Sequence, residues 1–341
     1  MKVAVFSTEP YDRKFLDAAN HRANAGHEFI YFDTRLEPES ASLVDGCQAI
    51  CAFVNDDLGS ETLKILADQG VQFIALRCTG FNNVDLSTTA ELGIKVSRVT
   101  VYSPYSVAEF VIAMIQMLNR KLYKAYNRTR DDNFSLNGLM GFDLHGRTVG
   151  IIGTGKIGVI LAQVMHGFGC HLLGYDPYPN PKFGEVGDAR YVELPELLAN
   201  SDIISLHCPL TDDNHHLINQ NTIAQMKPGV MLINTSRGKL VDTKAVINGI
   251  KSGQIGHLGI DVYEQESEIF FKDLSDTIIQ DDTFQLLQSF PNVVVTSHQG
   301  FFTEDAMNGI STTTVTNITD FEQGNPLKNE VKPPERVTVS V

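Results

Sequence analysis

The strongest constraint on the fold of this chain is a regular alternation of short apolar runs with longer amphipathic stretches. Runs such as 148–152, 203–207 and 230–234 are rich in Val, Ile and Leu. Such runs are typical of parallel strands buried on both faces. Stretches such as 156–168 and 243–251 between them have the apolar spacing of helices. This alternation predicts βαβ units and a doubly wound α/β fold.

The chain of 341 residues is long enough for two domains. A βα pattern fills residues 1–101, well before a glycine-rich motif that begins at Gly153. We therefore expect a middle domain at 102–299 and a discontinuous outer domain that combines 1–101 with 300–341. A final helix-like run could pack on either domain, and we assign it to the outer one. The segment 332–335 contains two prolines and is predicted to be an exposed tail.

The charge of the chain excludes some partners. Acidic residues outnumber basic ones by 41 to 27, and the formal net charge is −14 at pH 7. Nucleic acids and anionic membranes attract positive surfaces, so we expect neither as a partner. No apolar stretch approaches the roughly 20 residues of a membrane span. The first apolar run, 1–6, is too short for a signal peptide core. An anionic substrate is compatible with this charge, because one buried arginine can hold a small acid.

The cysteines indicate a reduced protein without a metal site. They are Cys47, Cys51, Cys78, Cys170 and Cys208, an odd number with no C-x-x-C pair. This pattern favours neither a disulfide framework nor structural zinc. Reduced thiols fit a cytoplasmic location, which we expect here.

A cofactor motif begins at Gly153. The string Gly-Thr-Gly-Lys-Ile-Gly at 153–158 is a complete G-x-G-x-x-G, placed between a strand-like and a helix-like run. A second strand-like run ends at Asp176, close to the roughly 20-residue spacing of the acidic residue in dinucleotide-binding domains. Gly153 permits the tight turn, Gly155 lets backbone approach the pyrophosphate, and Gly158 allows helix and strand to pack closely.

Asp176 distinguishes between two cofactors. Its carboxylate can accept hydrogen bonds from ribose hydroxyls and would repel a 2′-phosphate, which favours NAD over NADP. The alternative is a glycine-rich turn that binds nothing, with Asp176 as an ordinary strand-end residue. The presence of every part in order favours NAD.

Three later strand-like runs end in chemically useful groups: Arg237, the acids Glu264, Glu266 and Glu268, and His298. Ligands of open α/β sheets bind outside the carboxyl ends of the strands. An arginine can hold a carboxylate through two parallel hydrogen bonds. A histidine can exchange a proton with a carbonyl oxygen, and a carboxylate behind it orients the ring and stabilises its charged form. Taken singly, each group is more often an ordinary surface residue, and the spacing does not select one acid. Their joint placement indicates hydride transfer to a 2-oxo acid.

Several strings resemble the D-isomer-specific 2-hydroxyacid dehydrogenases. They are 153–158, Asn-Thr-Ser-Arg-Gly at 234–238, Asp-Val-Tyr at 261–263 with Glu266, Ser-His at 297–298, and the stretches 77–85 and 205–211. The resemblance covers nearly the whole chain. Segments 102–104, 270–273 and 279–282 are similar to the fermentative, lactate-forming branch of that family.

This resemblance implies NAD-dependent reduction of pyruvate to D-lactate. It assigns Arg237 to substrate binding, selects Glu266 as the partner acid and makes His298 the proton donor. The implied NAD-site residues are Gly153, Gly155, Lys156, Ile157, Gly158, Asp176, Cys208, Pro209, Asn214, Thr235 and Asp261. The implied substrate contacts are the backbone of Cys78, Thr79 and Gly80, together with Tyr102 and Arg237.

The resemblance also implies an architecture. We expect a Rossmann-type NAD domain, a flavodoxin-like substrate (catalytic) domain formed by the outer segments, and a cleft between them. We expect a homo-oligomer, a dimer or tetramer, built through the NAD domains. Three positions depart from the common family pattern: Ser267 replaces a proline, Phe110 a histidine, and Gln299 a small residue. None of these changes removes a catalytic group.

Two alternatives remain open at this point. The chain could act on a bulkier 2-oxo acid, such as 2-oxoisocaproate or phenylpyruvate, because spacing does not reveal the pocket walls. It could instead be an NAD-sensing, corepressor-like binding protein on the same scaffold. The absence of basic or long disordered segments disfavours this second alternative.

Overall fold

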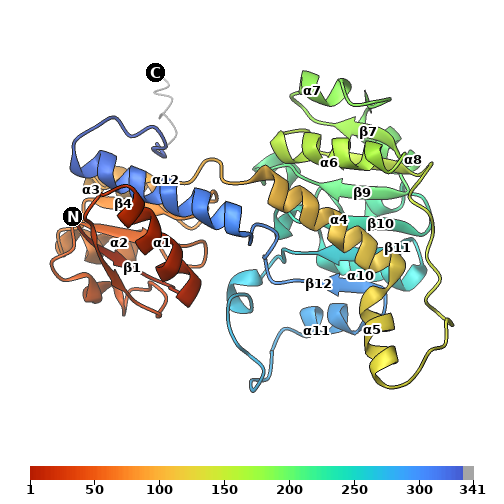
Figure 1. Cartoon of the computed structure of the whole chain (residues 1–341), viewed down its shortest axis with the longest axis horizontal. Helices are drawn as coiled ribbons and strands as arrows, with labels where there is room; N and C mark the ends of the chain where they lie inside the picture. Colours follow the sequence, from red (N-terminus) through yellow and green to blue (C-terminus); the bar gives the residue numbers. More distant parts are fainter. Residues whose placement is uncertain (333–341) are drawn as a thin grey trace, which may run out of the picture. The chain divides into compact units, whose positions relative to one another are not determined.

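The computed structural model describes residues 1–332, and these form two compact units (Figure 1). Unit 1 comprises Met1–Ser103 and the described chain from Thr303 onward, and unit 2 comprises Pro104–Phe302. Each unit is built on a parallel sheet, so the predicted pair of doubly wound domains is confirmed. The tail predicted at 332–335 lies, from residue 333, outside the described residues.

Unit 1 contains a five-stranded parallel sheet in the order β2-β1-β3-β4-β5. Its strands are β1 (Lys2–Val5), β2 (Glu28–Tyr31), β3 (Ala49–Ala52), β4 (Phe73–Leu76) and β5 (Lys95–Ser97). Its helices are α1 (Pro10–Arg22), α2 (Ser60–Asp68), α3 (Leu86–Leu92) and α12 (Glu304–Glu322), with a short 3-10 turn η1 (Ala41–Val44). This strand order is the flavodoxin-like one that was expected.

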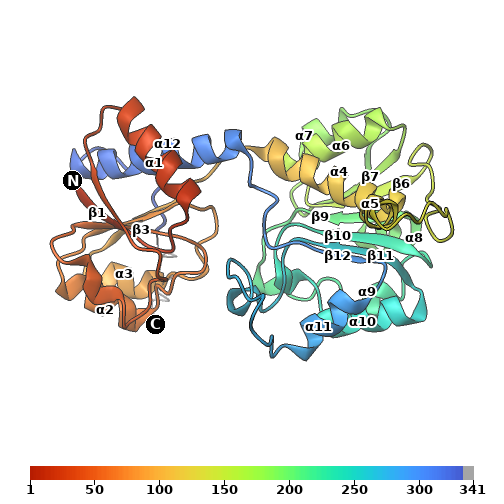
Figure 2. The ribbon, with the colours of Figure 1, turned by 60° about the horizontal axis from the view of Figure 1, so that its bottom comes forward.

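Both faces of this sheet are covered, which explains why its strands are apolar at successive positions. Val3 and Val5 of β1 face a cluster with Leu16 of α1 and Ile318 of α12. Ala4, between them, faces a second cluster that contains residues of α2. Figure 2 shows α1 and α12 on one side of the sheet and α2 and α3 on the other. The C-terminal helix α12 thus completes the core of the first unit.

Unit 2 contains a seven-stranded parallel sheet in the order β12-β11-β10-β9-β6-β7-β8. Its strands are β6 (Thr148–Ile152), β7 (His171–Tyr175), β8 (Arg190–Tyr191), β9 (Ile203–Leu206), β10 (Val230–Asn234), β11 (Ile255–Ile260) and β12 (Val293–Val295). The strand order reverses between β6 and β9, as in Rossmann domains, and a ligand crevice opens at the carboxyl edge of such a switch point.

Helices cover both faces of the second sheet (Figure 2). They are α4 (Pro104–Arg120), α5 (Leu122–Arg130), α6 (Lys156–Gly167), α7 (Pro181–Gly184), α8 (Leu194–Asn200), α9 (Gln220–Ile223), α10 (Thr243–Ser252) and α11 (Asp282–Ser289). Residues of α4 and α6 pack in one core, and those of α8, α10 and α11 pack in the other. Three 3-10 turns follow strands whose carboxyl ends form the site. They are η2 (Asp212–Asn214), η3 (Gly238–Leu240) and η4 (Glu266–Glu268). Within residues 1–332, no helix combines the length and apolarity needed to span a membrane.

The docking of α12 on unit 1 can be tested at one aromatic pair. The rings of Phe73 and Phe321 stack with centroids 4.5 Å apart and planes 6° apart. Phe321→Ala should lower the free energy of unfolding by about 2–3 kcal/mol, since it removes this contact and leaves a partial cavity. Thr312→Ala, at an exposed position of the same helix, should change it by less than about 0.5 kcal/mol. Equal effects of the two changes in denaturant titrations would contradict this packing role.

Candidate active site

The loops at the carboxyl edge of the unit 2 sheet touch one another in a continuous series. The glycine loop after β6 meets the segment after β9, because a Cβ on Gly153 would lie 2.5 Å from the backbone nitrogen of Cys208. Ser236, after β10, donates a hydrogen bond to the carbonyl of Cys208 at 2.6 Å. A Cβ on Gly238 would lie 2.1 Å from the carbonyl carbon of Tyr263, after β11. These contacts join the four loops after β6, β9, β10 and β11 to one another.

The glycine motif has the local geometry that dinucleotide binding requires. Gly153 has a φ of +94°, which favours glycine. A Cβ on Gly158 would lie 2.2 Å from the carbonyl oxygen of Gly153, so the start of α6 packs directly on the turn. Gly155 precedes α6, and a Cβ there would meet no atom of the protein within 4 Å. The protein itself gives no reason for glycine at 155, whereas the approach of a pyrophosphate to the backbone does.

A polar network fixes Asp176 at the end of β7. Its Oδ2 accepts hydrogen bonds from the backbone nitrogen and the hydroxyl of Thr154, at 2.7 and 3.2 Å. Its Oδ1 accepts one from the backbone of Tyr178 at 2.9 Å. The hydroxyls of Thr154 and Tyr191 lie 2.6 Å apart, and Asn180 bonds to both residues. The sequence pattern did not indicate a role for Thr154, Asn180 or Tyr191, because their network forms only when β8 pairs with β7.

Burial keeps two side chains after β9, next to the glycine loop, electrically neutral. Burial lowers the pKa of His207 to about 4, and burial raises the pKa of the Cys208 thiol to about 11. The ring of His207 lies 2.8 Å from the hydroxyl of Ser205. Cys208 is therefore a thiol at neutral pH and not a nucleophile.

Other predicted cofactor residues occupy the same edge. Lys156 and Ile157 form the first turn of α6. Pro209 and Asn214 belong to one turn, in which Asn214 donates to the carbonyl of Pro209 at 2.7 Å and accepts from the backbone of Thr211 at 2.8 Å. The side chain of Asn214 thus shapes the loop after β9.

Thr235 and Arg237 follow β10. Asn234 holds this turn, since it donates to the carbonyl of Arg237 at 2.8 Å and accepts from Ser236 at 3.0 Å. The guanidinium of Arg237 uses one donor on the carbonyl of Ser236 at 2.7 Å. The hydroxyl of Thr235 is buried without a hydrogen-bond partner in residues 1–332. An unsatisfied buried hydroxyl at this edge fits contact with a bound dinucleotide.

Glu266 and His298 form a pair beside this turn. Nδ1 of His298 lies 3.0 Å from Oε1 of Glu266, and the other oxygen of Glu266 accepts from the backbone of Tyr263 at 3.0 Å. Tyr263 also lies against Gly238, so the turn that carries Arg237 contacts the turn that carries Glu266. Nδ1 therefore faces the carboxylate, and Nε2 is the ring nitrogen available for proton exchange.

Asp261 fixes the loop that carries His298. Its buried carboxylate accepts hydrogen bonds from the hydroxyl of Thr296 at 2.5 Å and from the backbones of Gln299 and Gly300 at 2.8 Å each. Burial raises the pKa of Asp261, while these donors oppose that shift. The backbone nitrogen of His298 donates to the carbonyl of Asp261 at 2.7 Å. Asp261 thus acts on His298 through the loop backbone.

Phe110 packs against the loop that carries His298, and Glu264 anchors the start of α10. A Cβ on Gly300 would lie 3.3 Å from the ring of Phe110, so this α4 side chain packs behind the histidine loop. Glu264 binds His216 at 2.7 Å through Oε1 and accepts from the backbone of Thr243 at 2.9 Å through Oε2. Glu264 therefore ties the start of α10 to the chain after β11, while Glu266 is the acid that meets His298.

The remaining predicted substrate residues belong to unit 1. The segment after β4 is held by hydrogen bonds from Arg98 to the carbonyl of Thr79 at 2.9 Å and from Val99 to that of Cys78 at 3.0 Å. The thiol of Cys78 lies 3.2 Å from the carbonyl of Gly80. Tyr102 also lies in unit 1, where its backbone approaches Gly309 of α12.

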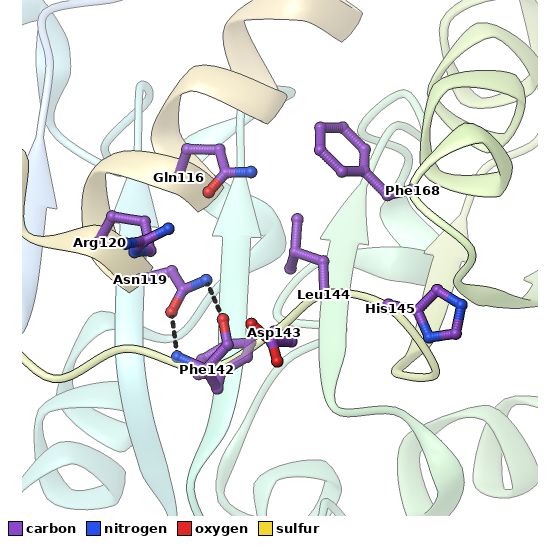
Figure 3. Close-up of a pocket in the computed structure, with 8 residues that line it drawn as sticks. All are labelled: Gln116, Asn119, Arg120, Phe142, Asp143, Leu144, His145 and Phe168. Atoms are coloured by element: carbon purple, nitrogen blue, oxygen red, sulfur yellow. Dashed lines mark hydrogen bonds between the residues drawn. The ribbon is translucent and has the colours of Figure 1, made fainter.

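A separate pocket of about 390 Å³ lies at the opposite, amino edge of the unit 2 sheet (Figure 3). It is lined by Gln116, Asn119, Arg120, Phe142, Asp143, Leu144, His145 and Phe168. Asn119 binds both backbone polar groups of Phe142 at 2.8 Å and so holds its floor. These residues precede β6 or follow α6, so the pocket does not belong to the series of carboxyl-edge loops.

Comparison with known proteins identifies the family of this chain. Residues 112–300 match the NAD-binding domain model of the D-isomer specific 2-hydroxyacid dehydrogenases. The D-lactate dehydrogenase of Escherichia coli K12 is 50% identical over 331 residues, which cover 97% of this chain and 100% of that protein. The chain belongs to the D-isomer specific 2-hydroxyacid dehydrogenase family, and unit 2 contains its NAD-binding domain.

Solved structures agree with this assignment. The apo structure of E. coli D-lactate dehydrogenase superposes with a TM-score of 0.89 at 48% identity, covering 97% of this chain and 100% of that one. The pyruvate reductase of Chlamydomonas reinhardtii gives a TM-score of 0.91 at 44% identity, covering 96% and 98%. The predicted family, fold class and NAD cofactor are confirmed.

The role of Asp176 in cofactor choice gives a direct binding test. Asp176→Ala should weaken NADH binding about tenfold or more, because hydrogen bonds to a charged group contribute roughly 1.5–3 kcal/mol. NADPH should gain relative to NADH, since the repulsion of a 2′-phosphate is removed. Fluorescence titration of both nucleotides measures this, with the exposed Asp188→Asn as control. An unchanged ratio of the two dissociation constants would exclude Asp176 as the discriminating residue.

Proposed function

We propose that this chain catalyses the reversible, NAD-dependent reduction of pyruvate to D-lactate. The observation that carries the proposal is the pairing of His298 with Glu266, 3.0 Å apart, at the carboxyl edge of an NAD-binding sheet. The 50% identity to E. coli D-lactate dehydrogenase and the similarity to a pyruvate reductase support pyruvate as the substrate.

In the proposed reaction, pyruvate, NADH and a proton give D-lactate and NAD⁺, and the bound nicotinamide supplies the hydride. Arg237 holds the substrate carboxylate through parallel hydrogen bonds and polarises the reacting carbonyl. Protonated His298 donates the proton on Nε2 to the carbonyl oxygen and becomes a neutral imidazole. Glu266 orients the ring through Nδ1 and stabilises its charged form. Lactate oxidation reverses each of these transfers.

The substrate contacts expected from unit 1 stay predictions. The backbone of Cys78, Thr79 and Gly80 is proposed to bind the carboxylate, and Tyr102 to face the substrate. We also propose that unit 1 is the substrate domain.

The proposed function predicts a specific product and a specific dependence on His298. NADH consumption with a panel of pyruvate, 2-oxoisocaproate and phenylpyruvate should show the highest kcat/KM for pyruvate, with D-lactate as the product. His298→Ala should lower kcat by roughly 10²–10⁴, the usual contribution of a general acid, with little change in NADH affinity. Reduction needs the protonated ring and oxidation the neutral ring, so rates should rise toward acid pH for reduction and toward alkaline pH for oxidation.

Different outcomes separate the alternatives. A preference for a bulkier acid would keep the reaction class and replace the substrate. NADH binding without turnover of any panel member would favour the NAD-sensing protein. Parallel pH profiles in both directions, or an active His298→Ala variant, would remove His298 from its proposed role.

We also propose a homo-oligomer, a dimer or tetramer, formed through unit 2. Support comes from large apolar side chains that are exposed on and after α5: Leu122, Tyr126, Phe134, Leu136 and Met140, which are 61–86% exposed. Solvent exposure of so many apolar groups in one segment marks an interaction surface. Residues that line the amino-edge pocket flank this segment in the chain, since Gln116, Asn119 and Arg120 precede it and residues 142–145 follow it.

The oligomer can be tested by introducing charge on this surface. Leu136→Glu with Met140→Glu should reduce the molar mass measured by light scattering to that of one 37.6 kDa chain, because buried unpaired carboxylates oppose association. Leu43→Glu, at a half-exposed position of unit 1, is the matched control. A monomeric parent protein, or a double variant of unchanged mass, would contradict the proposal.

A cytoplasmic location is proposed as well. No disulfide joins any of the five cysteines, all of which lie in the described chain, as is usual in a reducing compartment.

A further inference from the structure

Phe271 adopts a backbone conformation that bulky side chains avoid. Its φ is +62°, in the left-handed region. For an aromatic residue this is a genuine outlier, because Cβ crowds the backbone. Strained conformations persist only where the surrounding structure imposes them, and they concentrate at functional sites. The fold therefore holds the backbone of Phe271 in a conformation that costs free energy.

The chain that leads into Phe271 is anchored. Phe270 is 3% exposed and packs with Tyr263 and Phe284, and its backbone nitrogen donates to the carbonyl of Glu266 at 2.8 Å. Tyr263 donates through its hydroxyl to Asp281 at 2.7 Å, and Asp281 caps the start of α11. The burial of Phe270 and these anchors hold the chain immediately before position 271.

The strained backbone brings the ring of Phe271 to His298. The centroids of the two rings are 6.0 Å apart, and their planes are tilted by 36°. Phe271 also packs against the cluster of Tyr263, Phe270 and Phe284. An apolar wall backed by this cluster therefore adjoins the imidazole, whose Nδ1 faces Glu266.

We propose that Phe271 is a positioning residue for His298. Its ring restricts the imidazole to the orientation in which Nδ1 meets Glu266, and it covers part of that pair, whose side chains remain 21% and 26% exposed. Nε2 is thereby presented to the substrate. This inference deepens the proposed function and rests on it, since it assigns a role in presenting the proton donor.

A purely structural role for Phe271 makes a different prediction. If the ring only fills space in the apolar cluster, activity should follow the stability of the fold. Glycine separates the two cases, because it removes the ring and also relieves the strain at positive φ. Phe271→Gly is the main variant, Phe271→Leu keeps apolar volume without a flat ring, and Phe271→Tyr keeps the ring. Ile278→Ala, at an 82% exposed position in the same segment, is the matched control.

Two readouts test the proposal. Steady-state kinetics with pyruvate should show kcat at least about tenfold lower in Phe271→Gly and lowered in Phe271→Leu, with the KM for NADH unchanged and Tm near the parent value. Phe271→Tyr should retain most of the activity. Independently of turnover, diethyl pyrocarbonate should modify His298 several-fold faster in the glycine and leucine variants, as measured by mass spectrometry of the peptide that contains it.

The outcomes are distinguishable. Parent-like kcat and parent-like modification of His298 in Phe271→Gly would overturn the proposal, as would a loss of kcat that only follows a loss of folded protein. If the glycine variant fails to fold, the leucine variant decides by the same two readouts. A parent protein that reduces no 2-oxo acid would refute the proposed function, whereas the modification rates would still decide whether Phe271 covers His298.

Discussion

The functional edge of unit 2 depends on the close approach of Gly238 to the peptide of Tyr263. A Cβ at 238 would lie 2.1 Å from that peptide, so only glycine permits the contact. Arg237 immediately precedes this glycine, and Glu266 binds the backbone nitrogen of Tyr263. The contact therefore fixes the turn that carries the guanidinium against the turn that carries the acid. The position of His298 depends on the same contact, because its ring binds Glu266. Its loop is in turn held by hydrogen bonds to Asp261.

Charge is distributed unevenly along this edge. The loops next to the glycine motif present a neutral imidazole at 207 and a neutral thiol at 208, both a consequence of burial. Arg237, Glu266 and His298, the groups proposed to take part in the reaction, lie together on the loops after β10, β11 and β12. In a proton-coupled hydride transfer this separation is useful, because the charge that changes during the reaction is compensated locally by one carboxylate. The buried carboxylate of Asp261 is engaged with donors of the loop that carries His298.

The parts of the structure that could be predicted from sequence are those encoded by local pattern. Alternating apolar runs predicted the parallel sheets, and the glycine motif with Asp176 predicted the cofactor. Both patterns lie within short segments of the sequence. The long-range contacts were not predictable in this way. Glu264 and Glu266 are two positions apart, yet only the folded turn directs one to His216 and the other to His298. Spacing alone left them equivalent, and the family resemblance selected Glu266. The environment of Phe110 and the network of Tyr191 likewise depend on packing between distant elements.

The return of α12 to unit 1 affects how the protein is made. Helix α1 covers part of the apolar face formed by Val3, Val5 and Phe73, and residues 304–322 cover the rest. During translation, unit 2 has its whole sequence before this helix is synthesised, whereas the first unit still lacks part of its core. The earliest residues to leave the ribosome thus belong to the last domain to finish folding, which reverses the usual N-terminal-first order of multidomain chains.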